Sequence, residues 1–407
     1  MAKFIQPKIF SEFKCDGSKC NSMCCKNWSI DVDTETYQKY LELKIPNVEW
    51  NEASKKYLFK LLPNGSCPCL DDDGLCKIQK QHGESFLSIT CKQYPRIVQA
   101  VNPNIFTRSF TLTCPIAADL ILRQTEPLKF TQIESDSQLK VNVNLLYLDD
   151  QAAENLIELR MIAIRILQNR RMTIDQRLLT LGFFISQVGD IRTDFDIVRY
   201  NLKMLDELCA SDRFIKIELP KFCRAIKFDA EDFVRIMLNL LETMYGQKSG
   251  FGVREEFLDF IKSTGTLYMD ENNVSSIPKT AKKYLKLKSV REKFFKHASI
   301  IIENSLVNEF WSQCFPYRFT NIKPTQNYFF FVIMYKLKEF LLLSYLEVQR
   351  RKSHSMSKSK VEDAAIQAAK MFSMLFEHQI PIVDKISGIA KNKGDDIYAN
   401  LSSMLQV

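Results

Sequence analysis

Beyond about residue 128, apolar residues recur along the chain with the spacing of amphipathic helices. In FDAEDFVRIMLNLLETMYG they fall on one helical face, at Phe233, Ile236, Met237, Leu240, Leu241 and Met244. The same spacing predicts long helices over 144–171, 299–314, 326–350 and 360–378. A further helix is expected from Thr173, where T-I-D-Q has the form of a capping box. The C-terminal two-thirds of the chain is therefore predicted to be a helical domain.

The most apolar stretch of the chain, Tyr328 to Leu346, is almost long enough to cross a bilayer. It carries Lys336, Lys338 and Glu339 in its middle, and charges at that depth in a membrane are costly. We therefore predict a core helix with one face in water, and no membrane span.

The N-terminal part has shorter segments of mixed pattern. WSIDVD (28–33) and FTRSFTLTCP (106–115) alternate like strands, whereas 34–44 and 51–62 are predicted as helices. The expected fold class is thus mainly α. It consists of a cysteine-rich, loop-rich α+β metal module over residues 1–128, followed by a larger all-α helical domain over residues 129–407.

Cysteine is concentrated in the N-terminal module. Nine of the twelve cysteines lie in one window, at Cys15, Cys20, Cys24, Cys25, Cys67, Cys69, Cys76, Cys91 and Cys114. A chain of 407 residues is long enough to form a hydrophobic core without disulfides. Because Lys3, Pro7 and Lys8 interrupt any signal-peptide pattern, we expect a reducing, cytoplasmic location. Clustered cysteines in that compartment more often bind metal than form disulfides.

The ligand types favour an all-sulfur metal site. Iron–sulfur clusters use thiolates almost exclusively, and His82 is the one histidine near the window. Zinc stays open as the alternative, because four-cysteine zinc sites exist and Cys20-x3-Cys24 partly meets their spacing. Disulfides or free thiols also stay open. Whichever metal is bound, it could take part in chemistry or only hold loops together.

The net charge of +8 is modest for this length, and we expect neither nucleic acid nor a membrane as partner. The densest basic run comprises Lys279, Lys282, Lys283, Lys286, Lys288, Arg291, Lys293 and Lys296. It is interpreted either as the solvated face of a helix or as a docking surface for an acidic protein. The chain has no P-loop, and Cys25 directly after Cys24 breaks the C-x3-C-x2-C triad of standard radical enzymes that cleave S-adenosylmethionine.

Three blocks of sequence resemble the bacterial flagellin lysine N-methylases. They are FKCDGSKCNSMCCKNWSIDVDTETYQKY, CPCLDDDGLCKIQKQHGESFLSITCKQYPR and FTLTCPIAADLIL. The C-x3-CC core is also similar to a wider group of zinc- or iron-chelating proteins. A further block, ENSLVNEFWSQCFPYRF (Glu303–Phe319), resembles the C-terminal region of the methylases. The resemblance is strongest over residues 13–122.

The resemblance implies a protein with a [4Fe–4S] cluster that uses S-adenosylmethionine to methylate lysine side chains of flagellin. The family's metal-binding positions correspond here to Cys15, Cys20, Cys24, Cys25, Cys67, Cys76, Cys91 and Cys114. Cys69 departs from the family pattern and is not expected to be a ligand. Eight thiols exceed the four that one cluster needs, which leaves one cluster or two.

Several functional assignments are left open by the sequence. It assigns no catalytic base and no donor site, although Tyr94 and Tyr317 lie near the resembling blocks. We hypothesise that flagellin docks on the Lys279–Lys296 run. The alternative function is a non-enzymatic protein that chelates zinc or carries a cluster, with a helical interaction domain.

Overall fold

The computed structural model of the chain has two compact units. Unit 1 comprises residues 1–120, 129–144 and 249–253, and unit 2 comprises residues 121–128, 145–248 and 254–407. The structure describes residues 2–20, 22–26, 28–135, 143–144, 148–192, 195–245, 255–270, 273–274, 276–353, 357–378 and 380–407.

Unit 1 contains a five-stranded mixed sheet in the order β7-β1-β6-β5-β8. Its strands are β1 (Ala2–Pro7), β5 (Arg96–Ala100), β6 (Ile105–Phe110), β7 (Phe130–Ser135) and β8 (Val143–Asn144). β1 is parallel to β6 and antiparallel to β7, so the first residues of the chain lie inside the sheet rather than leading into it. β6 coincides with the strand predicted within 106–115, which is confirmed.

A second, three-stranded antiparallel sheet in unit 1 has the order β2-β4-β3. It is formed by β2 (Asp31–Val32), β3 (Val48–Asn51) and β4 (Lys56–Phe59). The helix predicted over 51–62 is therefore wrong. Asn51 accepts hydrogen bonds from Ser54 and starts a turn, and Trp50 then pairs with Tyr57 across the hairpin. Such cross-strand aromatic contacts stabilise a strand pair more than the weak helical pattern stabilises a helix.

Short helices connect these strands. They are α1 (Thr34–Glu42), α2 (Lys77–His82), α3 (Ile89–Gln93) and α4 (Pro115–Leu122). Asp33 caps α1 by accepting a hydrogen bond from the Thr36 amide, and its other carboxylate oxygen accepts one from the Ile89 amide at the start of α3. One side chain thus ties together the starts of two helices.

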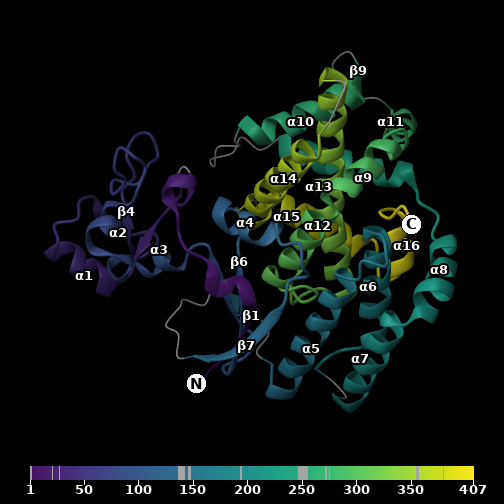
Figure 1. The fold of residues 1–407 in the computed structure, drawn as a ribbon, viewed down its shortest axis with the longest axis horizontal. Coiled ribbons are helices and arrows are strands. Elements are labelled where there is room, and N and C mark those ends of the chain that lie inside the picture. The colour runs from purple at the N-terminus through teal and green to yellow at the C-terminus, as the bar shows by residue number, and fades with distance from the viewer. Residues whose placement is uncertain are drawn as a thin grey trace. The chain divides into compact units, whose positions relative to one another are not determined.

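Unit 2 is helical, as predicted for this part of the chain (Figure 1). Its helices are α5 (Asp150–Leu167), α6 (Ile174–Val188), α7 (Phe195–Ala210), α8 (Leu219–Ala225), α9 (Ala230–Tyr245), α10 (Glu255–Tyr268), α11 (Ile277–Leu285), α12 (Lys288–Ser312), α13 (Pro324–Ser353), α14 (Lys358–His378), α15 (Ile380–Asn392) and α16 (Ile397–Ser402). A short hairpin, β9 (Met269–Asp270) and β10 (Asn273–Val274), follows α10. The predicted mainly α fold class is confirmed.

Helix α13 forms the centre of unit 2, where it contacts α6, α10, α12, α14 and α15 (Figure 1). Its residues from Asn327 to Leu343 are buried without interruption. The predicted capping box at the start of α6 is confirmed, because Thr173 and Gln176 each accept a hydrogen bond from the other's amide. None of the helices in the described ranges is both long and apolar enough to cross a membrane.

Candidate functional site

The cysteines of unit 1 are gathered by backbone contacts between loops. The Cys67 amide donates to the Cys25 carbonyl at 2.7 Å, and Lys26 and Ser66 form an isolated β-bridge beside this bond. The Lys77 amide donates to the Cys69 carbonyl at 2.8 Å, which holds the CPC segment against the start of α2. Cysteines from segments about 40 residues apart in the sequence therefore lie side by side.

Five of these thiols belong to one hydrophobic core. Cys67 and Cys69 are buried together with Ile30, Tyr40 and Phe59. The half-buried members packed against them are Cys25, Cys76 and Cys91. The Tyr40 hydroxyl accepts a hydrogen bond from the Ser88 amide at 3.1 Å, and Ser88 in turn caps the helix that carries Cys91. Helix caps and one buried tyrosine thus fix the loops that carry the thiols.

Two of the cysteines stand at helix starts, where backbone N–H groups face their sulfur atoms. Cys76 precedes α2, and burial raises the pKa of its thiol, while the amides of Gln79 and Ile78 oppose this by stabilising the ionised form. Cys114 precedes α4, and the amides of Ile116 and Ala117 do the same. Such N–H donors favour thiolate, the form in which cysteine binds a metal.

Two thiol pairs are unequal in acidity. The Sγ atoms of Cys24 and Cys25 are 3.7 Å apart. The Cys25 thiol donates a hydrogen bond that lowers the pKa of Cys24, and the pKa of Cys25 is raised in return. Cys69 lowers the pKa of Cys67 in the same way, at the cost of a raised pKa of its own. In each pair the contact stabilises one thiolate and disfavours the other.

A second thiol group surrounds Cys15. Burial and, to a smaller extent, the neighbouring sulfurs of Cys24, Cys20 and Cys114 raise the pKa of Cys15 to about 11. Burial likewise raises the pKa of Cys114 to about 11, and that of Cys91 to about 12. Without a cation, these sulfurs stay protonated at neutral pH, because burial disfavours each thiolate and neighbouring thiolates add repulsion. A bound metal would remove that repulsion.

The donor chemistry of these residues fits a thiolate-bound metal, although the structure does not assemble a coordination shell. All twelve cysteines, each within the described ranges, are free thiols. In the part of the chain that the structure describes, no group of three histidine, cysteine or acidic side chains is close enough to hold an ion. The eight predicted ligands thus divide into a group near Cys15 and a group near Cys67, with Cys24 electrostatically coupled to both.

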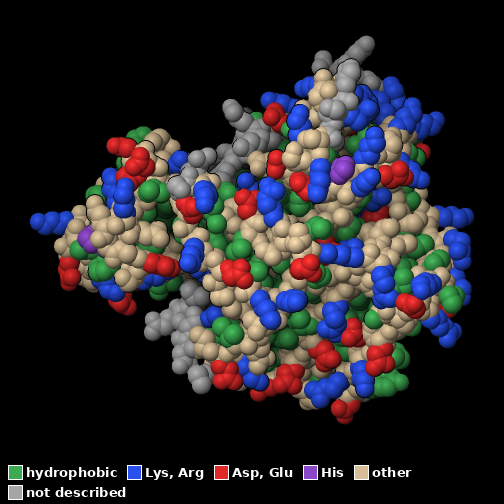
Figure 2. Space-filling model, viewed as in Figure 1, with side chains coloured by type: hydrophobic (Ala, Val, Ile, Leu, Met, Phe, Trp, Pro, Cys, Tyr) green, Lys and Arg blue, Asp and Glu red, His purple; other side chains and the backbone are tan. Residues whose placement is uncertain are grey.

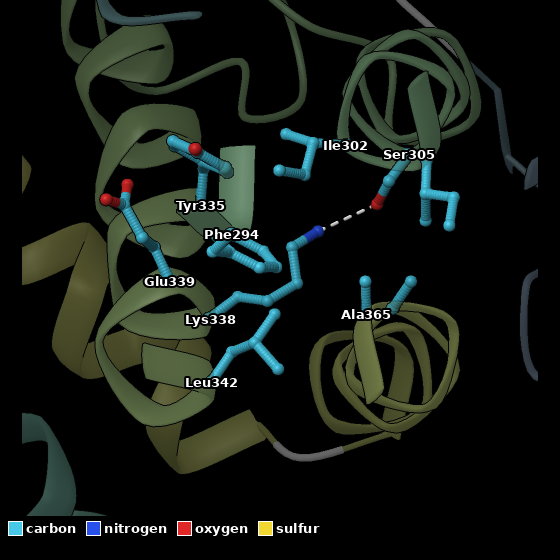
Figure 3. Close-up of a pocket in the computed structure, with 10 residues that line it drawn as sticks. Phe294, Ile302, Ser305, Tyr335, Lys338, Glu339, Leu342 and Ala365 are labelled. Carbon is cyan, nitrogen blue, oxygen red and sulfur yellow. Dashed lines mark hydrogen bonds between the residues drawn. The ribbon is translucent and has the colours of Figure 1, made fainter. Parts of the chain in front are cut away.

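A small cavity in unit 2 lies between α12, α13 and α14 (Figure 3). Its volume is about 20 Å³, which is room for about one water molecule. Lys338 extends its amine along this cavity to Ser305 Oγ at 2.8 Å and also donates to Glu309. This cavity is too small for a nucleoside or a lysine side chain, and its one lysine is already paired with a carboxylate.

Several of the buried charges in this domain form ion pairs. Glu303 accepts from Arg177 at 2.7 Å and from Arg170 at 3.0 Å. Lys336 donates to Asp175 at 2.8 Å and to Glu339 at 2.7 Å. These ion pairs join the α5–α6 link and α6 to α12 and α13. None of these side chains is therefore a free acid or base. Glu303, the first residue of the block Glu303–Phe319, is therefore an anchor of the core.

The buried charges correct two expectations. The water-facing side predicted for 328–346 is wrong, since Lys336 and Glu339 are at most 1% exposed as side chains and Lys338 is 8% exposed. The spacing of apolar residues within one helix does not show which charged residues on other helices will pair with it. The partners of these charges lie on α6 and α12. Arg291 is likewise no surface residue of the basic run, because its guanidinium binds Asp175 and Glu339.

Neither tyrosine near the resembling blocks is an obvious base. The Tyr94 hydroxyl lies 3.0 Å from Thr113 Oγ1. The Tyr317 hydroxyl is buried, and burial raises its pKa above the ordinary range. A tyrosine with a raised pKa stays protonated and accepts no proton from an ammonium.

Comparison with known proteins shows what kind of helical domain this is. Residues 160–407, which make up most of unit 2, match the family described as FliB lysine N-methylase C-terminal domain. The chain therefore belongs to the FliB lysine N-methylase family. No solved structure matches this chain.

Three curated relatives are similar to parts of the chain. The flagellar biosynthetic protein FliU of Salmonella muenchen is 32% identical over 151 residues, which is 33% of this chain and 85% of FliU. The lysine-N-methylases of Salmonella typhimurium and Salmonella choleraesuis are each 31% identical over 175 residues, which is 39% of this chain. The match spans 41% of the length of each of these two enzymes.

Proposed function

We propose that this protein transfers methyl groups from S-adenosylmethionine to lysine side chains of flagellin. The observation that carries the proposal is the match of residues 160–407 to the C-terminal domain of the FliB lysine N-methylases. The names of two relatives, lysine-N-methylase, and of a third, flagellar biosynthetic protein, support a flagellar acceptor.

The proposed reaction is a displacement at the methyl carbon of the sulfonium donor. The lysine nitrogen forms a bond to that carbon, the carbon–sulfur bond breaks, and its electron pair stays on sulfur as S-adenosylhomocysteine. The nitrogen must first be neutral, but with a pKa of about 10.4 only about one free lysine in 2,500 is neutral at pH 7. The site must therefore desolvate the acceptor ammonium or take its proton with a base.

We further propose that the cysteines of unit 1 hold a [4Fe–4S] cluster, with zinc as the alternative metal. The candidate ligands are Cys15, Cys20, Cys24, Cys25, Cys67, Cys76, Cys91 and Cys114. The N–H groups aimed at Cys76 and Cys114 support this assignment, because they stabilise ligating thiolates. When bound, the cluster would supply either a Lewis-acidic iron for the donor's amino and carboxyl groups or a rigid tie between loops.

The decisive test is whether S-adenosylhomocysteine forms in an acceptor-dependent way. Purified protein is incubated with S-adenosylmethionine, with and without flagellin, and the product is quantified chromatographically. We expect product only when flagellin is present. Flagellin whose lysines have been acetylated is the matched control, since acetylation removes the nucleophile. Absence of product under anaerobic conditions with a full metal complement would contradict the proposal.

A second candidate function is a non-enzymatic metal carrier. The concentration of thiols in unit 1 supports it independently of the helical domain. This function predicts transfer of metal to an apo-acceptor and no binding of S-adenosylmethionine. Isothermal titration with S-adenosylhomocysteine separates the two functions, because only the methylase should bind it.

A further inference from the structure

Six exposed lysines lie on α11, on the link that follows it and on the first turns of α12. They are Lys279, Lys282, Lys286, Lys288, Lys293 and Lys296, and we call them the lysine surface. Lys and Arg side chains gather over α11 in Figure 2. Glu292 is the one acidic residue between the first and the last of these lysines. Within the described residues, no ion pair is recorded for Lys282, Lys286 or Lys293.

The two helices differ in how well they accommodate these lysines. Lys282 lies in the last turn of α11, where the helix dipole favours a cation, but Lys286, the C-cap residue four positions later, places a like charge near it. α12 begins at Lys288 and has no acidic residue in its first turn, although the helix dipole favours anions there. Helix stability therefore does not account for the lysine at the start of α12, and an external anion bound there would be favourable.

The lysine surface is attached to the rigid core of unit 2. Arg291, which lies between Lys288 and Lys293, points inward and binds Asp175 and Glu339. Val290 and Phe294 on the same helix are buried, with 5% and 1% exposure. The lysines of α12 are thus presented by a helix that three inward-facing side chains hold in place. A surface held in this way offers a fixed pattern of charge to a partner.

The chemistry of this surface points to a protein partner. Lysines act as strongly hydrated point charges, which speed a salt-dependent encounter more than they tighten a complex. Leu285, at 49% exposure, is the one large apolar residue between 279 and 296 recorded as exposed in the described structure. An amphipathic membrane helix would need several such anchors, and a nucleic-acid site commonly adds exposed aromatic rings for stacking.

We propose that the lysine surface docks an acidic segment of the protein whose lysines are methylated. This proposal rests on the proposed function, because it takes the partner to be the methyl acceptor. Docking through long-range attraction of modest strength suits a substrate that must be released after the reaction. The surface thus selects the acceptor by a segment that is distinct from the lysine to be modified.

The test compares two charge-reversal variants of equal net charge. The first combines Lys282→Glu, Lys286→Glu and Lys293→Glu. The control combines Lys203→Glu, Lys385→Glu and Lys391→Glu, three exposed lysines on α7 and α15 of the same unit. The probe is a fluorescein-labelled polyglutamate peptide, and its binding is measured by fluorescence anisotropy at low and at physiological salt. We expect the first variant to bind about tenfold more weakly than the control, and wild-type binding to weaken with salt.

Each outcome supports or overturns the proposal. Equal weakening in both triple variants would show an effect of total charge and overturn it. Tighter binding of wild type to phosphatidylglycerol vesicles or to a single-stranded RNA than to polyglutamate would also overturn it. The binding measurement contains no methyl donor, so a failure of methyl transfer leaves its result unchanged. With flagellin as acceptor, the first variant should raise KM by about tenfold while the control does not.

Discussion

Lys336 Nζ lies 2.8 Å from Oδ1 of Asp175 in the interior of unit 2, and neither side chain is more than 2% exposed. Arg291 and Glu339 complete this group, so that two cations meet two carboxylates. The amide of Gln406 donates to the same aspartate at 2.9 Å. The group therefore joins α6, α12, α13 and the last residues of the chain.

Breaking this buried pair should be strongly destabilising. Lys336→Met leaves Asp175 and Glu339 with one cation between them, and we expect unfolding free energy to fall by about 3–5 kcal/mol. The matched control is Lys323→Met, whose partner Asp395 is on the surface (65% and 52% exposed), with an expected change of about 0.5 kcal/mol or less. Urea unfolding of both variants measures the difference. Similar losses in the two would contradict the role given to Lys336.

Acid should remove the contribution of Asp175. Burial by itself would raise the pKa of Asp175, but Lys336 and Arg291 outweigh that effect and lower it. A carboxyl with a lowered folded pKa stabilises the fold above its unfolded pKa of about 3.9, and this stabilisation is lost as pH falls through the folded value. The difference in unfolding free energy between wild type and Asp175→Asn should thus be constant from neutral pH to about pH 5. It should become smaller below about pH 4. A difference in unfolding free energy that increases as the pH falls would contradict the predicted direction.

Gly182 allows α6 to approach α13 and α16 closely. A Cβ at this position would lie 2.8 Å from Leu401 Cδ1 and 3.1 Å from Tyr328 Cε1. Both neighbours are fully buried, so Gly182→Ala should cost about 1–3 kcal/mol. Gly388→Ala in α15 is the control, because a Cβ there meets nothing within 4 Å. That variant should be neutral or more stable by up to about 1 kcal/mol, as thermal unfolding would show.

The cysteine assignments make a prediction about metal content. Cys67→Ser and Cys76→Ser should each lower iron and sulfide per chain, because both residues are proposed ligands. Cys69→Ser and Cys209→Ser should retain them, since Cys69 is not among the proposed ligands and Cys209 is a buried thiol of α7. Metal analysis after anaerobic purification gives the counts. If Cys69→Ser lost as much iron as Cys67→Ser, the ligand set would be wrong. Zinc in place of iron would favour the alternative metal.

The helical domain was predictable because apolar residues that recur with helical spacing indicate a helix with a buried face. The segments 326–350 and 360–378 lie in observed helices, and 299–314 lies in α12 as far as the last residue of that helix, Ser312. The helix predicted over 144–171 is shorter in the structure, Asp150–Leu167, where Asp149 caps it. The hairpin of β3 and β4 was missed because Trp50 and Tyr57 contact each other across a turn, which no local period can show.

The candidate site was predictable in composition and not in arrangement. The sequence alone picks out the cysteines by their number. It does not show that the Cys67 amide binds the Cys25 carbonyl, because that contact depends on how two loops fold. The pairing of Lys336 with Asp175 was likewise hidden, since their 161-residue separation leaves no sequence pattern.

Methyl transfer from a labelled donor tests the central claim most directly. Flagellin is incubated with this protein and S-adenosylmethionine bearing a trideuterated methyl group, then digested and analysed by mass spectrometry. The account predicts lysine-containing peptides heavier by about 17 Da per methyl, against about 14 Da with unlabelled donor. Flagellin that gains no mass on any lysine, from protein with its full metal content, would contradict the account.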